Sequence, residues 1–214
     1  MMNQKVKSGK KSPGRARPTS ESRQRIIDAA VKLFARHGYA GTGMRELAAE
    51  AGVNLAMINY FFGSKKGLLK ELLDEFFAGY LEVTRKQLEG DRDALEKLDG
   101  FIQAAVAYFA GRRDHLVVVI TELPHDDPEV IDHKAAWGRQ MMRLLGKEIC
   151  TPLSEQRDWP VTPLLLGPLL TSMMASRFLF APISDRLKDG APDTDTGDYA
   201  RTLSRIIREG LMPR

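Results

Sequence analysis

The sequence has 214 residues, of which 43% are hydrophobic and 28% charged, as in ordinary globular proteins of one large domain or two small ones. Its single cysteine, Cys150, excludes an internal disulfide framework and is typical of a protein kept in a reducing compartment. The first residues contain no apolar run of the signal-peptide type, so we expect a cytoplasmic protein.

Positive charge is concentrated in the first third of the chain. Residues 1–19 carry six basic and no acidic side chains, and residues 20–70 carry eight basic and four acidic ones. Residues 71–214 reverse the balance, with eighteen basic and twenty-four acidic side chains. This distribution predicts that the N-terminal third meets a polyanion and that the remainder does not.

Residues 1–19 are rich in lysine, arginine, serine, glycine and proline and show no hydrophobic periodicity. Such a segment buries too little apolar surface to fold, so we expect a disordered basic arm. Two roles stay open for it: a contact to a polyanion, or a leader that only keeps the protein in solution.

A first helix is predicted directly after this arm. Thr19 and the serines that follow it are candidate N-caps, Ile27 and Phe34 lie on one apolar face, and Gly38 is a candidate C-cap.

Two shorter helices are predicted next. Thr42 or Gly43 caps the second helix, which ends at a tight turn around Gly52. Asn54 then caps a third helix that runs from Leu55 to about Phe62.

Three short helices with a glycine turn between the second and third form a helix-turn-helix unit, whose third helix fits the major groove of DNA. Asn54 at the cap can hold a phosphate or a base edge, Ala56 permits close approach, and Asn59 can form a bidentate contact to adenine. Lys65 and Lys66, just beyond the helix, can neutralise phosphates.

The rest of the chain is predicted to be a helical bundle. Apolar residues recur at helical spacing over residues 69–80, 95–109, 131–149 and 199–211. The β-branched run at 115–123 fits a buried strand or a buried helix, and we prefer the helix because no partner strand is visible. Residues 159–176 carry no charge, but prolines interrupt them, so we expect a buried helix and no membrane span.

The stretch "GTGMRELAAEAGVNLAMINYFFGSKKGLL" resembles the DNA-binding segment of TetR-type (AcrR-like) transcriptional repressors. The residues that match the family pattern there are Thr42, Met44, Arg45, Glu46, Leu47, Ala48, Ala51, Gly52, Val53, Phe62, Ser64, Lys65, Leu68 and Leu69. The run "INYFFGSK" is similar to a subgroup of regulators that sense fatty acids or other small apolar metabolites. Two positions depart from the usual pattern, Asn59 where the family has tyrosine and Phe61 where it has histidine or tyrosine.

The resemblance implies an all-α protein with a disordered arm (1–19), a helix-turn-helix DNA-binding domain (20–66) and a helical ligand-binding and dimerisation domain (67–214). It implies a repressor that binds a palindromic operator in double-stranded DNA as a homodimer and is released by a small, apolar effector. The residues that it places on the operator are Thr42, Arg45, Asn54, Leu55, Ala56, Asn59, Tyr60 and Lys65.

Two further sets of residues belong to the larger domain in this interpretation. The expected dimer interface comprises Leu166, Leu169, Leu170, Met173, Phe180, Leu203, Ile206 and Ile207. The expected ligand-binding residues are Phe76, Phe77, Phe101, Phe109, Trp137, Met141, Met142 and Met174. The alternative for both sets is an ordinary hydrophobic core, since apolar stripes at helical spacing form cores as well.

No phosphate-binding glycine loop, nucleophile elbow or zinc-protease motif is present, so we expect no enzyme and no cofactor. The run "HDDPEVIDH" has metal-ligand residue types without a compact spacing, so we expect no metal, and it is typical of a helix start at Pro128. The competing hypothesis is a small-molecule-binding or scaffold protein whose N-terminal helices contact another protein.

Overall fold

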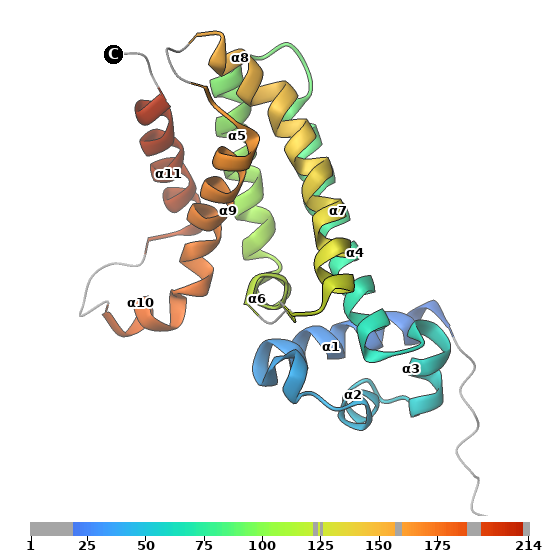
Figure 1. Cartoon of the computed structure of the whole chain (residues 1–214). Helices are drawn as coiled ribbons and strands as arrows, with labels where there is room; N and C mark the ends of the chain where they lie inside the picture. Colours follow the sequence, from blue (N-terminus) through green and yellow to red (C-terminus); the bar gives the residue numbers. More distant parts are fainter. Residues whose placement is uncertain (1–18, 122–123, 125, 157–159, 188–193, 212–214) are drawn as a thin grey trace, which may run out of the picture.

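The computed structural model describes residues 19–121, 124, 126–156, 160–187 and 194–211, and this part of the chain contains helices and no strand (Figure 1). The predicted all-α class is confirmed. The predicted basic arm at 1–19 lies outside the described residues except for Thr19, whose hydroxyl accepts a hydrogen bond from the Ser22 amide and caps the first helix.

One end of the molecule is formed by α1 (Ser20–Gly41) and two shorter helices, α2 (Met44–Glu50) and α3 (Leu55–Phe62). The predicted stop at Gly38 is present as a break inside α1, where the residue has a φ of 75° that favours glycine. Gly52 turns the chain between α2 and α3 with a φ of 63°, and α3 has the predicted bounds.

A long helix links this end to the rest of the chain. α4 (Lys65–Leu88) begins two residues after α3, at the N-cap Ser64, and packs along α5 (Ala94–Ala110). The turn after α5 leads to α6 (Arg113–Thr121), which lies against α1 (Figure 1). The helical interpretation of the β-branched run is therefore confirmed up to Thr121.

α7 (Pro128–Leu145) is the next long helix; it starts at Pro128 as predicted, and Asp127 caps its first turn. It continues through a π-helical turn, η1 (Gly146–Cys150), into the short helix α8 (Thr151–Ser154). Pro152 has no amide hydrogen for the helical ladder, and the wider turn before it accommodates this loss.

The last described helices are α9 (Pro163–Leu179), α10 (Ala181–Leu187) and α11 (Thr196–Leu211). Within the described ranges, no single helix is long and apolar enough to cross a membrane. Taken together, α9 and α10 are long and apolar enough by length and composition alone, but the two helices are bent by 56° relative to each other.

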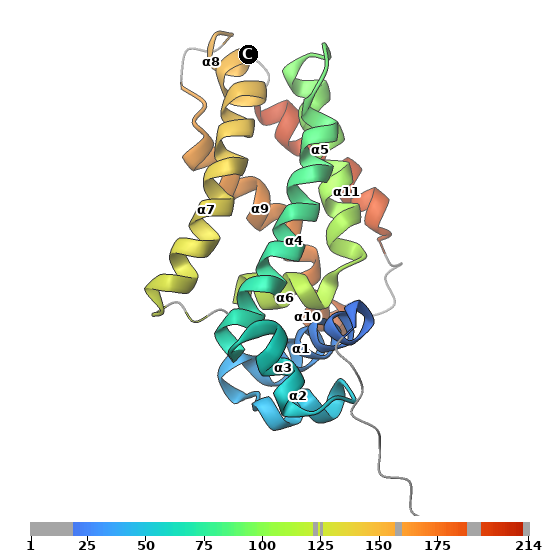
Figure 2. The same cartoon turned by 90° about the vertical axis from the view of Figure 1, so that its right-hand side faces the viewer.

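One hydrophobic core connects the two ends of the molecule. Buried side chains of α1–α3 join those of α4, and the same cluster continues through α5, α6 and α9. Figure 2 shows α4 rising from α1, α2 and α3 between α5 and α7, so α4 contacts both parts of the protein. Of the two candidate sites described next, one is on α3, before the start of α4, and the other lies along the length of α4.

Candidate nucleic-acid interface and ligand pocket

The helix α3 has one face turned into the protein and one turned to solvent. Met57, Ile58 and Phe62 are buried against α1, α2 and α4. The opposite face carries the predicted operator residues Leu55, Ala56, Asn59 and Tyr60, all exposed. Tyr60 retains 72% of its accessible surface, so packing in the core does not explain its aromatic ring.

The first turn of α3 is fixed by its own cap. The side-chain oxygen of Asn54 accepts a hydrogen bond of 2.9 Å from the Met57 amide, which satisfies an otherwise unpaired helix donor. Asn54 is itself exposed. Arg45 on α2 is also exposed.

The aromatic run that follows is divided between the two faces. Phe62 is buried, Tyr60 is exposed, and Phe61 is partly buried with its ring edge-on to that of Tyr60 at 5.3 Å. Phe62 therefore anchors α3 to the core, and Phe61 supports the ring of Tyr60.

Thr42 does not lie on the exposed surface, contrary to its predicted place on the operator. Its side chain is only 2% exposed, and its hydroxyl hydrogen-bonds to the carbonyl oxygens of Gly38 at 2.9 Å and Leu33 at 3.3 Å. The hydroxyl thus satisfies carbonyls at the break in α1, and its role is structural.

Lys65 and Lys66 are both engaged within the protein. Lys65 donates hydrogen bonds to the carbonyls of Tyr39 (2.8 Å) and Thr42 (2.9 Å), and burial lowers its pKa. Lys66 lies 2.7 Å from a carboxylate oxygen of Asp127, at the start of α7, and its hydrogen bonds to Asp127 and Glu129 raise its pKa to about 12. Both lysines hold α4 in place, a use that the sequence did not reveal.

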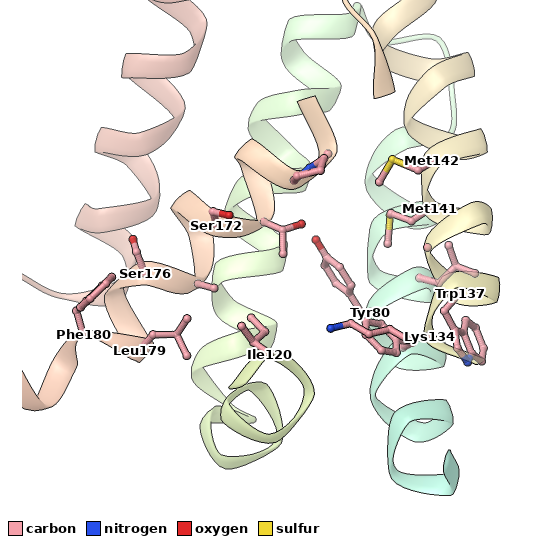
Figure 3. A pocket seen from close by; sticks show the side chains of 17 residues that line it. Tyr80, Ile120, Lys134, Trp137, Met141, Met142, Ser172, Ser176, Leu179 and Phe180 are labelled. Carbon is pink, nitrogen blue, oxygen red and sulfur yellow. The ribbon is translucent and has the colours of Figure 1, made fainter. Parts of the chain in front are cut away.

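A pocket of about 570 Å³ lies between α4, α6, α7 and α9 (Figure 3). Of the predicted ligand-binding residues, Phe77, Trp137, Met141 and Met142 line it. A volume of this size is within the range of small-molecule sites.

The other predicted ligand-binding residues, Phe76, Phe101, Phe109 and Met174, do not line this pocket. All are at most 2% exposed. The ring of Phe76 stacks on that of Phe109 at 6.1 Å, and Tyr80 contacts Phe101 and Phe109. These rings are core, because their helical positions direct them between α4 and α5.

Several residues that line the pocket were not predicted from the sequence. The polar ones are Tyr80, Lys134, Thr171, Ser172 and Ser176. Lys134 lies four residues before Gly138, on the same face of α7. This helical spacing is the signal in the sequence that its side chain points inward.

A polar contact joins the pocket wall to α4. The indole nitrogen of Trp137 donates a hydrogen bond of 2.6 Å to a carboxylate oxygen of Asp74, and His133 lies 2.8 Å from the same oxygen. The ring of Trp137 also stacks on Phe77 at 6.5 Å. α7 is thus attached to α4 next to the pocket.

The predicted dimer residues fall into two groups. Leu166, Leu170 and Leu203 are buried within the chain, and Met173 and Ile207 are partly buried. Leu169, Phe180 and Ile206 are exposed, at 52%, 58% and 56%. The exposed group has further apolar neighbours on α9, Leu164 and Leu165.

Within the described residues, no group of three or more histidine, cysteine or acidic side chains could hold a metal ion. His125, part of the run considered for metal ligands, lies outside them.

The helix-turn-helix part of the sequence matches a known protein family. The family described as "Bacterial regulatory proteins, tetR family" matches residues 26–72, which cover α2, α3 and parts of α1 and α4. Several curated relatives match over a limited part, and the chain spans between 28% and 55% of the length of the first ones.

Two solved structures share the fold. FadR from Bacillus subtilis in complex with stearoyl-CoA has a TM-score of 0.71 at 20% identity, covering 87% of this chain and 98% of that one. AibR in complex with isovaleryl coenzyme A and operator DNA has a TM-score of 0.71 at 16% identity, covering 86% and 97%.

A full-length relative establishes the family. The transcriptional repressor SCO4008 from Streptomyces coelicolor is 33% identical over 200 residues, which cover 90% of this chain and 96% of SCO4008. The relatives are named as regulators and not as enzymes, which agrees with the absence of enzyme motifs. The chain belongs to the TetR family of bacterial transcriptional regulators.

Proposed function

We propose that this regulator is a repressor that binds a palindromic operator as a homodimer and is released by a small apolar effector in the pocket between α4, α6, α7 and α9. The observation that carries the proposal is the exposed face of α3. Asn59 and Tyr60 are exposed on it, while Met57, Ile58 and Phe62 on the opposite face of the same helix are buried.

The DNA contacts in this proposal come from Arg45, Asn54, Leu55, Ala56, Asn59 and Tyr60. Asn59 at mid-helix provides the paired donor and acceptor that recognise a base edge in the major groove, and Asn54, whose oxygen caps the helix, offers its amide nitrogen as a donor. The small side chain of Ala56 lets the helix approach closely. Thr42 and Lys65 support this face from behind through the hydrogen bonds described above.

The homodimer would form through the exposed apolar side chains of α9 and α11. Leu164, Leu165 and Leu169 on α9, with Ile206 on α11, leave an apolar surface that a second copy would cover. A symmetric pair can then place two α3 helices about 34–36 Å apart, one turn of DNA. The domain ranges 20–66 and 67–214 remain part of the proposal.

The effector would occupy the pocket, whose lining is mostly apolar. The two solved structures of similar fold are complexes with stearoyl-CoA and isovaleryl coenzyme A, so acyl compounds are the first class to test. Because binding to DNA and to the effector is thermodynamically linked, an effector that lowers DNA affinity must itself bind more weakly to the DNA complex.

The test is selection of duplex DNA from a random library by the purified full chain, followed by affinity measurements at several salt concentrations. We expect a palindromic consensus and an affinity that falls steeply as salt rises, because phosphate contacts release counterions. A chain that enriches no sequence, or whose affinity is insensitive to salt, would instead be a scaffold or storage protein. Native mass spectrometry of the same sample measures the subunit number and any retained ligand.

A further inference from the structure

The pocket contains one cationic side chain. Of the described residues that line it, only Lys134 carries a charge, and the walls around it are formed by Ile120, Trp137 and Leu179. Figure 3 shows the ammonium group of Lys134 and the hydroxyl of Tyr80 pointing from the α4 and α7 side toward α6 and α9. An apolar space with a single cation at one wall is complementary to an apolar molecule with a single anionic group.

No carboxylate neutralises Lys134 among the described residues. Its ammonium group donates one hydrogen bond of 2.8 Å, to the carbonyl of Val119, and it takes part in none of the ion pairs found in the described ranges. Burial lowers the pKa of Lys134. A partly buried ammonium with one neutral acceptor is destabilised relative to water, and two of its three donors remain for a ligand.

A second polar atom stands in the pocket wall. Tyr80 is only 5% exposed, and within the described part of the chain its hydroxyl has no partner at normal hydrogen-bond geometry, while the side chain of Thr171, which also lines the pocket, is close enough to lower its pKa. Burial raises the pKa of Tyr80, so the hydroxyl stays protonated and can donate. Buried polar atoms are normally hydrogen-bonded, so an unpaired hydroxyl in a pocket wall points to a ligand group as its partner.

We propose that the effector is an unesterified carboxylic acid with a long or bulky apolar body, whose carboxylate is bound by the Lys134 ammonium and the Tyr80 hydroxyl. The ligand's role as an effector rests on the proposed function, whereas its chemical class is inferred from the pocket alone. It predicts recognition of the free acid, because an ester or a thioester has no charge at that position for Lys134 to neutralise.

The competing explanation is purely structural. Val119 stands in the last turn of α6, where carbonyl groups lack helical partners, so Lys134 could serve only to cap that helix. Both explanations predict a change in stability when Lys134 is replaced. They differ in the ratio of affinities for charged and neutral ligands, which a helix cap does not affect.

The experiment is calorimetric titration of the full chain, without DNA, with four probes that share one alkyl chain. They are dodecanoate, dodecan-1-ol, dodecylamine and dodecanoyl-CoA, each used below its aggregation concentration. We expect dodecanoate to bind roughly 10- to 100-fold more tightly than the alcohol, as expected for a charge-assisted hydrogen bond, and the amine to bind most weakly.

Substitutions test which side chains cause the preference for the acid over the alcohol. Lys134→Met should reduce the ratio of acid to alcohol affinity to about one, Lys134→Arg should retain most of it, and Tyr80→Phe should lower it by roughly 2- to 10-fold. Lys86→Met, at an exposed position of α4 away from the pocket, is the matched control and should leave the ratio unchanged.

Equal affinities for acid and alcohol in the unaltered chain would overturn the proposal, as would an acid preference that survives Lys134→Met. Tighter binding of dodecanoyl-CoA than of dodecanoate would overturn it in favour of a thioester ligand, and binding of none of the probes would reject this ligand class. Because the titrations contain no DNA, these results are independent of the operator test, which alone decides whether the protein is a repressor.

Discussion

The exposed face of α3 and the pocket between α4, α6, α7 and α9 are both built on helix surfaces, but they relate differently to the core. On α3, the side chains proposed to bind DNA lie outside and those that stabilise the fold lie inside. In the pocket, Phe77 and Met141 both line the space and pack against the surrounding core. Function and stability are therefore separable on α3 and combined in the pocket.

The largest expected effect comes from the core behind α3. Phe34 is fully buried, so Phe34→Ala should lower the free energy of unfolding by about 3–5 kcal/mol, measured by urea denaturation. Tyr60→Ala, at an exposed position, should change that free energy by no more than about 0.5 kcal/mol. Similar losses in both variants would mean that the two faces of this region are not distinct.

A charged pair supports the larger region. Lys97 on α5 lies 2.7 Å from Glu148 in η1, with side chains 10% and 14% exposed. Lys97→Met should lower the free energy of unfolding by about 2 kcal/mol at neutral pH, less than for a fully buried pair because Lys147 remains beside Glu148. DNA affinity measured on folded protein should stay unchanged.

The same pair predicts a pH dependence. Hydrogen bonds from Lys97 and then Lys147 hold the pKa of Glu148 below its ordinary value of 4.5. A carboxylate with a depressed pKa adds stability above its unfolded-state pKa, and this stability is lost as pH falls through the folded-state pKa. Glu148→Gln should therefore reduce the loss of melting temperature between pH 5 and pH 3; an unchanged loss would assign it to other carboxylates.

On the exposed face of α3, Asn59→Ala should weaken operator binding about tenfold, through the loss of a bidentate base contact. The melting temperature should hardly change, because the side chain is exposed. Gln103→Ala, which removes an exposed side-chain amide from α5, is the matched control for titration against the selected operator. Equal affinities of the two variants would remove Asn59 from the interface.

The smallest expected effect lies in the pocket wall. A Cβ atom at Gly138 would meet nothing within 4 Å, so Gly138→Ala should stabilise α7 by about 0.5–1 kcal/mol. Gly67→Ala should do the reverse, because its Cβ would collide with the Phe62 carbonyl. Thermal denaturation should show a higher melting temperature for Gly138→Ala and a lower one for Gly67→Ala. A loss of stability in Gly138→Ala would show that the open space at this position is needed by the fold.

The helix-turn-helix region could be predicted almost residue by residue because its cues are local. A cap at Asn54 and positive φ at Gly52 are decided by neighbours a few positions away. The exceptions involve distant partners. Lys66 pairs with Asp127, sixty-one residues further along, and the inward direction of Thr42 follows from the break in α1.

The pocket could be predicted only in part because its walls come from helices far apart in the sequence. Phe76 and Phe77 are adjacent and equally apolar, yet one is core and the other lines the pocket. Helical periodicity identifies an inward stripe about 100° wide, and neighbouring residues differ by about the same angle. Which edge of the stripe meets a second helix and which meets empty space depends on tertiary packing.

The length of α4 has a geometric consequence for DNA recognition. Its 24 residues span about 36 Å, and only Gly63 and Ser64 separate it from α3. A rotation of about 5° around the end at Leu88 would carry the other end, and α3 with it, by roughly 3 Å, close to the rise of one base pair along the DNA axis. A small change in the angle of α4 would thus shift α3 by about one base pair along the operator.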